Sequence, residues 1–213
     1  GGYTRGRRRA RMTADKDALR AEMNIMRDEL SARDPDAGET LADKFPLKLL
    51  ERYGPTVAVY LPIGSEIDPR PLISKLISAG ATLALPCVQD DGSMVYRAYQ
   101  RGDMLEKRRF GLLEPNPEVP EVNPTLVLTP LLAFDRNGNR LGYGKGHYDR
   151  ALTRLRDQGR VFVCGLAFFG QEVETVPAES HDVPLDWVMT ERGSIPLFMM
   201  RAMAGNTDQT GEN

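Results

Sequence analysis

The sequence predicts an α/β protein, a three-layer α/β/α sandwich built around a mostly parallel, Rossmann-like sheet. Four short apolar segments rich in Val, Leu and Ala are typical of strands buried on both faces, as strands are in parallel sheets. These segments are Thr56–Leu61, Thr82–Leu85, Leu126–Thr129 and Val161–Ala167. Helical patterns alternate with them, which favours helices on both faces and ligands at the carboxyl ends of the strands. A length of 213 residues suits one domain.

Two helices are predicted before the first strand. The first spans Lys16–Arg33, where apolar residues recur at helical spacing, and Asp34-Pro35 supplies its stop. The second spans Glu39–Tyr53 and is ended by Gly54-Pro55, because proline disfavours helical backbone at the residue before it. After these two helices, the sequence changes to short apolar segments separated by turn residues.

The remaining elements complete the alternation of helices and strands. Asp68 is a good N-cap and Pro69 a good first residue for a helix between the first two strands. After the turn at Asp90-Asp91-Gly92, residues Met94–Tyr99 are predicted to form an edge strand. A further helix, Tyr148–Asp157, begins at a glycine-rich loop. The economical interpretation is strand, helix, strand, repeated along the chain.

The two ends of the chain differ from its middle. Residues 1–12 are predicted to be a disordered basic leader, because they hold five arginines and no apolar periodicity. Arginines without interleaved aromatic residues favour such a leader over a nucleic-acid-binding arm. Residues 13–200 are predicted to form one α/β domain, and residues 201–213 a flexible C-terminal tail.

Composition limits the partners that the protein is expected to have. A formal net charge of −2 gives no pull toward nucleic acid or anionic lipid, so neither is predicted as a partner. No apolar run has the length of a membrane span, and no signal peptide is recognisable. Cys87 and Cys164 lie in apolar stretches, which favours buried reduced thiols and a cytoplasmic location. A monomer is the default prediction, because no heptad pattern or long apolar edge is present.

The strongest chemical signal is a glycine-rich segment that follows the third buried strand. Gly142, Gly144 and Gly146 alternate there, and glycine lets successive backbone N–H groups converge on an anion. Arg140 and Lys145 add positive charge to the same segment. The N-terminus of the next helix is expected to point at the same place. The segment therefore predicts a phosphate-binding loop.

This loop matches neither of the two common phosphate-binding motifs. A Walker A loop needs Ser or Thr after Gly-Lys, where Gly146 stands, and the Rossmann pattern needs two residues before its last glycine. The glycines alone also suit a tight structural connection, which stays open as an alternative. A structural zinc site and a G-x-S-x-G nucleophile elbow are not predicted, since the chain lacks their patterns. Catalysis is therefore expected to depend on positioning and charge.

One stretch of the chain resembles a known family closely. The run from Pro130 to Asp149, with Arg140-Leu-Gly-Tyr-Gly-Lys-Gly-His-Tyr-Asp149 at its end, resembles the 5-formyltetrahydrofolate cyclo-ligases, also called 5,10-methenyltetrahydrofolate synthetases. Four further segments match that family in the expected order and extend the resemblance from Lys16 to about Thr190. These segments are Lys16-Asp-Ala-Leu-Arg20, Gly64-Ser-Glu66-Ile-Asp68, Phe110-Gly-Leu-Leu-Glu-Pro115 and His181-Asp182-Val-Pro-Leu-Asp186.

The resemblance implies a reaction that uses ATP and Mg²⁺. Members of that family cyclise 5-formyltetrahydrofolate to 5,10-methenyltetrahydrofolate and release ADP and phosphate. Phosphorylation of the formyl oxygen would create a good leaving group, and the N10 amine would then attack the activated carbon. Charge accumulates on the transferred phosphoryl group, so cations and backbone N–H groups are expected to carry the catalysis. The predicted partners are these two small-molecule substrates.

The resemblance also implies roles for residues of the phosphate half. Lys145 and Arg140 are the predicted catalytic residues, with Lys145 the better candidate to neutralise the transferred phosphate. Asp149 and Asp182 are the predicted magnesium ligands; the alternatives are a helix N-cap for Asp149 and a surface turn for Asp182. The predicted ATP-binding residues are Lys16, Arg20, Arg140, Leu141, Gly142, Tyr143, Gly144, Lys145, Gly146, His147 and Tyr148.

On the folate side, the resemblance implies three substrate-binding residues. Glu66 can accept hydrogen bonds from the paired N–H donors of a pterin ring; otherwise it is a solvent-facing carboxylate near the Asp68 cap. Phe110 and Tyr148 can pack on the flat rings of the substrate, although an aromatic residue beside a strand is also a common core residue. His147 stands where many members of the family carry Tyr or Phe, and it adds a titratable group near phosphate.

Two other kinds of function stay open at this point. A sugar-phosphate isomerase on a related α/β scaffold would use a similar glycine loop without magnesium and ATP. A non-catalytic folate- or nucleotide-binding module, or an RNA-binding relative that uses the basic leader, would not need the charged residues of the loop. Those residues are present, and it is site residues rather than fold that separate such functions.

Overall fold

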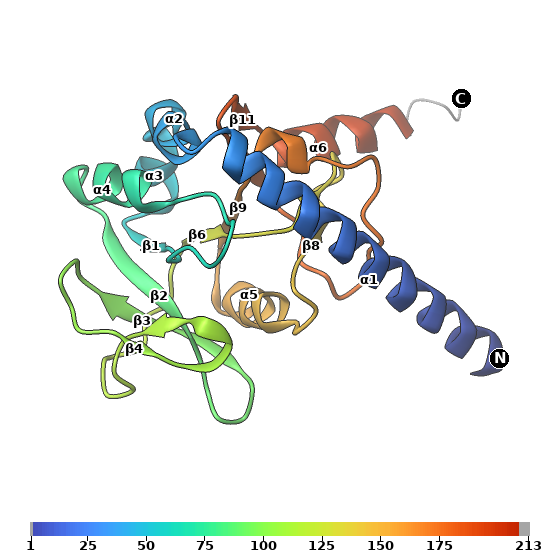
Figure 1. The fold of residues 1–213 in the computed structure, drawn as a ribbon, viewed down its shortest axis with the longest axis horizontal. Coiled ribbons are helices and arrows are strands. Elements are labelled where there is room, and N and C mark those ends of the chain that lie inside the picture. Colours follow the sequence, from blue (N-terminus) through green and yellow to red (C-terminus); the bar gives the residue numbers. More distant parts are fainter. Residues whose placement is uncertain (1, 209–213) are drawn as a thin grey trace.

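The protein is built around a seven-stranded sheet, seen in a computed structural model that describes residues 2–208 (Figure 1). The strand order is β11-β10-β9-β6-β1-β2-β3. The bounds of these strands are β1 Thr56–Ala58, β2 Thr82–Val88, β3 Met94–Tyr99, β6 Leu126–Thr129, β9 Phe162–Leu166, β10 Trp187–Thr190 and β11 Gly193–Ile195. Neighbours in the series from β10 to β2 pair in parallel, and β11 and β3 add antiparallel edges. The predicted edge strand, Met94–Tyr99, is confirmed.

Helices cover both faces of this sheet. Their bounds are α1 Gly2–Arg33, α2 Ala37–Lys44, α3 Lys48–Tyr53, α4 Arg70–Ser78, α5 His147–Gln158 and α6 Leu197–Asp208. On one face of the sheet, residues such as Val57 and Leu83 join a core cluster with residues of α2, α3 and α4. Their neighbours Ala58 and Ala84 join another cluster with Leu152 of α5. The alternation of a strand thus separates two cores, and the predicted three-layer α/β/α sandwich is confirmed.

Smaller elements surround the edge of the sheet where the parallel strands end. They are β4 Glu106–Lys107, β5 Leu113–Glu114, β7 Ala133–Phe134, β8 Arg140–Leu141 and the 3₁₀ turns η1 Arg109–Gly111 and η2 Phe169–Gln171. Strand β4 pairs with β5, and β7 pairs with β8. Met23 of α1 is buried with Leu132, Ala133 and Leu141, which follow β6 or belong to these small strands. This packing brings α1 to the same edge of the sheet.

The predicted helix Glu39–Tyr53 is wrong in one respect, because the structure divides it into α2 and α3. The break falls at Phe45 and Pro46, where Phe45 has extended backbone (ψ 123°). Pro46 explains the break, since its ring disfavours helical backbone at the preceding residue and it has no N–H to donate. The second prediction to be adjusted concerns α4: Pro69 is its N-cap, and Asp68 Oδ1 accepts the backbone N–H of Arg70 from outside the helix.

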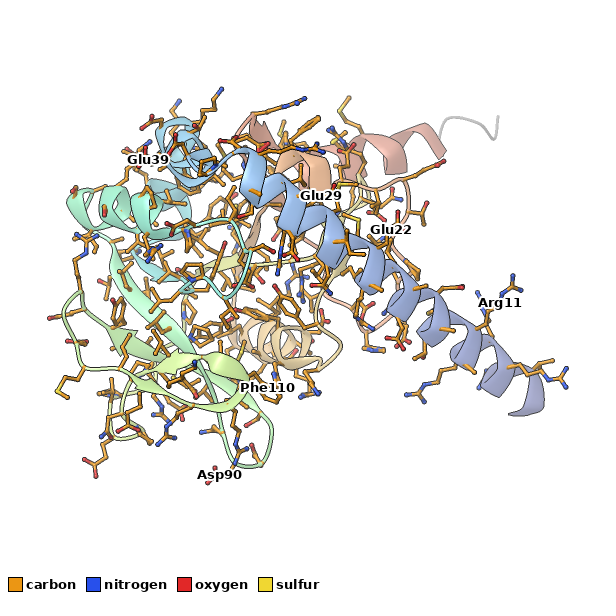
Figure 2. The ribbon with its side chains drawn as sticks, in the orientation of Figure 1. Arg11, Glu22, Glu29, Glu39, Asp90 and Phe110 are labelled. Atoms are coloured by element: carbon orange, nitrogen blue, oxygen red, sulfur yellow. The ribbon has the colours of Figure 1, made fainter. Side chains whose placement is uncertain are left out.

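The chain ends are more helical than the sequence predicts. Residues 2–12, within the predicted disordered leader, form the first turns of α1, and Arg11 lies on the part that extends past the body (Figure 2). Arginine and alanine are good helix formers, so a helix nucleated downstream can continue here without apolar periodicity. At the other end, α6 continues to Asp208 within the predicted tail 201–213, and residues 209–213 lie outside the described part.

Two further observations concern the predictions from composition. Cys87 and Cys164 are buried and free, as predicted, and burial raises the pKa of the Cys87 thiol to about 12. Among residues 2–208, none of the helices combines the length and apolar character that crossing a membrane requires.

Lys75 of α4 ties two of the helices on one face together. Its ammonium group donates to the carbonyl oxygens of Ala42 (2.8 Å) and Phe45 (3.0 Å), at the end of α2. We expect Lys75→Met to lower the free energy of unfolding by about 1–2 kcal/mol, because these carbonyls lose a charged donor. Urea denaturation measures the change, with the exposed Lys48→Met as the matched control. Equal midpoints for the two variants would contradict this role.

Candidate active site

A cavity of about 630 Å³ lies at the carboxyl ends of the parallel strands. Ile63, which follows β1, and Pro130, which follows β6, form part of its wall. Residues of α1, the 140–149 segment and the turn at His181 and Asp182 complete the lining. Open α/β sheets bind their ligands in this position, because loops from several strands meet there.

The glycine loop lines one side of the cavity in a conformation that requires glycine. Gly144 and Gly146 have positive φ angles of 89° and 70°, a region that L side chains rarely adopt. A Cβ atom at Gly144 would also lie 3.2 Å from the guanidinium carbon of Arg20. Gly146 is the N-cap of α5, so the positive end of that helix borders the cavity. The backbone here is suited to holding an anion.

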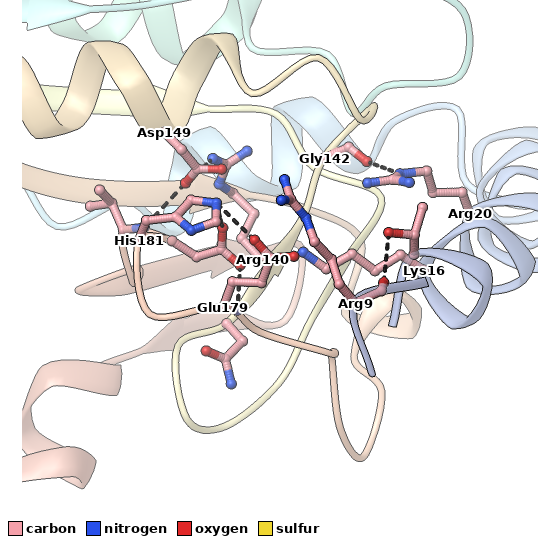
Figure 3. Close-up of polar contacts among 12 residues, drawn as sticks. Arg9, Lys16, Arg20, Arg140, Gly142, Asp149, Glu179 and His181 are labelled. Atoms are coloured by element: carbon pink, nitrogen blue, oxygen red, sulfur yellow. Dashed lines mark hydrogen bonds and ion pairs between the residues drawn. The ribbon is translucent and has the colours of Figure 1, made fainter. Parts of the chain in front are cut away.

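Helix α1 contributes two cations to the same cavity. Lys16 and Arg20 are four residues apart and therefore share a helix face. Arg20 Nε donates to the carbonyl oxygen of Gly142 (2.9 Å), and Lys16 Nζ lies 3.4 Å from Asp182 Oδ2 (Figure 3). These contacts join α1 to the glycine loop on one side and to the His181–Asp182 turn on the other. A helix distant in the sequence is thereby fixed against the glycine loop.

Arg140 and Asp149 form an ion pair at the base of the loop. Arg140 Nη2 lies 3.1 Å from Asp149 Oδ1, and the Arg140 side chain is only 5% exposed. Its Nε atom is buried and has no hydrogen-bond partner, so a donor beside the cavity is left without an acceptor. Val183 N–H also donates to Asp149 Oδ1 (3.1 Å), which fastens the turn that carries Asp182 to α5. Because Gly146 is the N-cap, the alternative N-cap role for Asp149 is wrong.

Three side chains meet where the glycine loop faces the β4–β5 hairpin. Phe110 has a φ angle of 58°, unusual for a residue with a side chain, and is 54% exposed. Its ring lies 5.3 Å from that of His147, and Lys145 Nζ lies 5.4 Å from the ring centroid of Phe110. Burial lowers the pKa of His147, and the charges of Arg150 and Lys145 lower it further. The loop's cation and a strained aromatic thus share one rim of the cavity.

A carboxylate stands at another part of the wall. Glu66 is only 8% exposed, so the alternative of a solvent-facing carboxylate is wrong. The backbone N–H of Ile63 donates to its Oε1 (2.8 Å), and the hydroxyl of Tyr143 donates to its Oε2. Tyr148, whose ring lies under the Arg140 guanidinium at 5.6 Å, also lines the cavity, and burial raises its pKa well above the usual range. The cavity therefore has cations at the loop and a buried carboxylate beside aromatic rings.

All of the residues that the sequence assigns to a site line this one cavity. They are Lys16, Arg20, Glu66, Phe110, Arg140, Leu141, Gly142, Tyr143, Gly144, Lys145, Gly146, His147, Tyr148, Asp149 and Asp182. The sequence did not single out Arg27, Tyr60 and Arg150, which line it too. A signal for Arg27 was available, because Lys16, Arg20 and Arg27 follow one another at spacings of four and seven along one helix face. Within the described part of the chain, no group of three or more His, Cys, Asp or Glu is arranged to hold a metal.

The fold and the site define an α/β protein whose cavity combines a cationic glycine loop with a buried carboxylate. A family model described as the 5-formyltetrahydrofolate cyclo-ligase family matches residues 12–191. A curated 5-formyltetrahydrofolate cyclo-ligase of Haemophilus influenzae is 32% identical over 180 residues, which cover 81% of this chain and 96% of that protein. The protein of that name from Escherichia coli K12 is 37% identical over 141 residues, 63% of this chain and 77% of its own.

Solved structures show the same likeness. The NMR structure of Aquifex aeolicus 5,10-methenyltetrahydrofolate synthetase has a TM-score of 0.67 and 30% identity, and the match covers 85% of this chain and 92% of that one. A 5,10-methenyltetrahydrofolate synthetase of Mycoplasma pneumoniae, at 23% identity and a TM-score of 0.65, shares the fold; the match covers 83% and 99%. The chain belongs to the 5-formyltetrahydrofolate cyclo-ligase family and is an enzyme of the ligase class. Neither an isomerase nor a non-catalytic module is favoured any longer.

Proposed function

We propose that this protein uses ATP to cyclise 5-formyltetrahydrofolate to 5,10-methenyltetrahydrofolate. The observation that carries the proposal is the convergence of Lys16, Arg20, Arg140 and Lys145 with the glycine loop on a cavity that also holds Glu66. The cations suit a triphosphate, and the buried carboxylate suits the N–H donors of a pterin ring.

Free thiols at Cys87 and Cys164 favour a cytoplasmic location. A monomer that binds only small molecules stays our prediction.

The proposed chemistry has two steps whose atoms and charges balance. The formyl oxygen on N5 attacks the γ-phosphorus of ATP, an O–P bond forms, and the bond to the leaving ADP oxygen breaks. N10 then attacks the formyl carbon, loses its proton, and the phosphorylated oxygen departs as inorganic phosphate. The product holds the carbon between N5 and N10. No protein nucleophile is required, so the chain contributes position and charge.

Each half of the cavity would serve one substrate. Lys145 and Arg140 would stabilise the charge of the transferred phosphoryl group, with the unpartnered Arg140 Nε available to a phosphate oxygen. Lys16 and Arg20 would hold the remainder of the phosphate chain. Phe110 and Tyr148 would pack on the flat rings of the folate. Because these groups line one cavity, they can hold the two substrates next to each other.

Asp149 and Asp182 would hold the magnesium ion. Both line the cavity, and carboxylate oxygens are the ligands that magnesium prefers, so these residues fit the ion. The hydrogen bonds of Asp149 from Arg140 and Val183 both go to Oδ1. A magnesium ion bound there would offset part of the negative charge on the ATP phosphates. Lys16 pairs with Asp182 and Arg140 with Asp149, so each carboxylate has a cation that offsets part of its charge.

An absorbance assay tests the proposed function. Purified protein with magnesium, ATP and 5-formyltetrahydrofolate should generate the methenyl chromophore. Omission of ATP, or chelation of the magnesium, should abolish the signal, because the formyl oxygen then has no phosphoryl donor or the donor lacks its counter-ion. The control is the same mixture with a folate that lacks the formyl group. A folded protein that makes no chromophore in the complete mixture would refute the proposal.

A further inference from the structure

A chain of hydrogen bonds links three elements of the cavity wall. Arg27 of α1 is only 5% exposed, and its Nε donates to the hydroxyl of Ser65 (3.0 Å). Its Nη1 donates to the hydroxyl of Tyr143 in the glycine loop. The Tyr143 hydroxyl in turn donates to Oε2 of Glu66. Side-chain hydrogen bonds thereby join helix α1, the glycine loop and the segment after β1.

The chemistry of the donors fixes the direction of this chain. A guanidinium group has N–H donors and no acceptor, so the Tyr143 oxygen must accept from Arg27. The single proton of the Tyr143 hydroxyl is therefore free to point at Glu66. The other oxygen of Glu66 already accepts the backbone N–H of Ile63 (2.8 Å). Both oxygens of Glu66 are acceptors in this arrangement, which is the geometry of an ionised carboxylate whose plane is set from two sides.

We propose that Arg27 and Tyr143 are specificity-determining positioning residues that hold Glu66 as an ionised, oriented acceptor for paired N–H donors of the substrate ring. The inference rests on the proposed function, because it concerns the folate half of that site. Its consequence is selective: a ring that presents two donors to Glu66 is accepted, whereas a ring that presents an acceptor there meets a carboxylate's lone pairs and is rejected.

Glu66 needs such support because its surroundings disfavour a charge. The pKa of Glu66 is raised, because the effect of burial exceeds the opposing effects of the hydrogen bonds from Tyr143 and Ile63 N–H and of the Arg27 charge, which limit the rise. The groups that face it are Arg27 of α1, Tyr143 of the loop, Tyr60 beyond β1 and Tyr148 at the start of α5. Burial raises the pKa of Tyr60 as well, so that ring is neutral and offsets no charge. Without the hydrogen bonds from Arg27 through Tyr143, Glu66 would be protonated more readily. A protonated Glu66 would offer a donor where the substrate also offers donors.

The first test measures Glu66 directly and needs no turnover. Tyr143→Phe keeps the ring and removes the hydroxyl, and a carbon-13 NMR titration of the Glu66 carboxyl, assigned with Glu66→Gln, follows its protonation. We expect the titration midpoint to move up by about one pH unit, because the variant loses a hydrogen bond to the charged form. Tyr99→Phe, which removes a hydroxyl outside this cavity, is the matched control and should leave the midpoint unchanged. A midpoint in Tyr143→Phe equal to that of the wild type overturns the proposal.

The second test asks which kinetic constant changes. For Tyr143→Phe we expect the KM for 5-formyltetrahydrofolate to rise about tenfold and the KM for ATP to rise much less, because the substitution removes only the hydroxyl that contacts Glu66 and leaves the loop backbone in place. The fall of kcat/KM for the folate on acidification should begin at a higher pH than in the wild type. Equal rises in both KM values would mean that Tyr143 acts on the phosphate loop, which contradicts the proposed role.

Arg27 supplies an independent check through a different element. Arg27→Met should raise the titration midpoint of Glu66, as Tyr143→Phe does. Arg27→Lys retains a charged donor, so its midpoint should lie closer to that of the wild type. If Arg27→Met folds and leaves the Glu66 midpoint unchanged, Arg27 has no part in the proposed role. A wild-type protein without turnover would refute the proposed function. The NMR titration would still decide whether the hydrogen bonds of Arg27 and Tyr143 set the protonation of Glu66.

Discussion

Replacement of Lys145 by alanine is expected to lower kcat by about 10³-fold, with a smaller change in the KM for either substrate. Lys145 is the cation at the centre of the glycine loop, and its side chain is exposed at the rim of the cavity rather than engaged in the core. Negative charge on the transferred phosphoryl group is greatest in the transition state, so its loss affects kcat more than ground-state binding. Steady-state measurement of methenyl product against ATP and folate concentrations separates the two effects.

The exposure of Lys145 makes this substitution informative. The Lys145 side chain is exposed, and its ammonium group lies 5.4 Å from the ring centroid of the half-exposed Phe110, so the variant should remain folded. Lys48→Ala removes the same charge from the exposed surface of α3 and should retain wild-type turnover. Lys145→Arg should recover part of the lost activity, because a charge returns to the loop with a different shape. Full activity in Lys145→Ala would mean that another group neutralises the phosphoryl charge.

The glycine loop shows what a single sequence can predict about this site. The alternation of Gly142, Gly144 and Gly146 predicts a loop backbone that needs glycine. Gly144 and Gly146 confirm this, because both have positive φ angles. The convergence of Lys16 and Arg20 on that loop is a different matter. More than a hundred residues separate them from the loop, and no local rule predicts which face of α1 meets it. The family resemblance predicts that Lys16 and Arg20 lie at the loop, and in the fold Arg20 donates to the carbonyl oxygen of Gly142.

Arg27 was missed for a physical reason. A charged residue in a predicted helix is normally expected to face solvent. A guanidinium group is buried only where acceptors are available for its N–H donors. Those acceptors are Ser65, Leu131 and Tyr143, which come from two distant parts of the chain. Sequence periodicity carries information about a helix and its own face, but it carries none about acceptors that tertiary packing brings to that face.

The errors in the fold have equally local causes. Neither β10 nor β11 is among the predicted strands. Strand β11 has the sequence Gly-Ser-Ile and therefore no apolar run, whereas β10, Trp187–Thr190, is as long as the predicted β6, so its length does not explain the omission. The break between α2 and α3 was missed, although Pro46 marks it in the sequence. Helix α1 begins earlier than predicted, since an apolar pattern shows where a helix packs and not where it starts. The core strands were easier to predict, because buried parallel strands are apolar throughout.

A second large effect is expected for Asp149→Asn, which should raise the magnesium concentration needed for half-maximal activity by at least about tenfold. At low magnesium, kcat should fall about 10²-fold. Asparagine retains an oxygen that can accept Val183 N–H, but it removes the negative charge that a magnesium ion and Arg140 would share. A magnesium titration at fixed ATP concentration measures the shift.

The structural role of Asp149 gives a clear competing expectation for the same variant. If its carboxylate serves only to fasten the Val183 turn and to pair with Arg140, the substitution should lower the free energy of unfolding and leave the magnesium dependence unchanged. Asp157→Asn is the matched control, because it removes an exposed carboxylate from the far end of the same helix, α5. A ligand role requires that the magnesium midpoint moves for Asp149→Asn and stays in place for Asp157→Asn. Saturating magnesium should then restore much of the activity of the first variant, since a weakened site can still be filled.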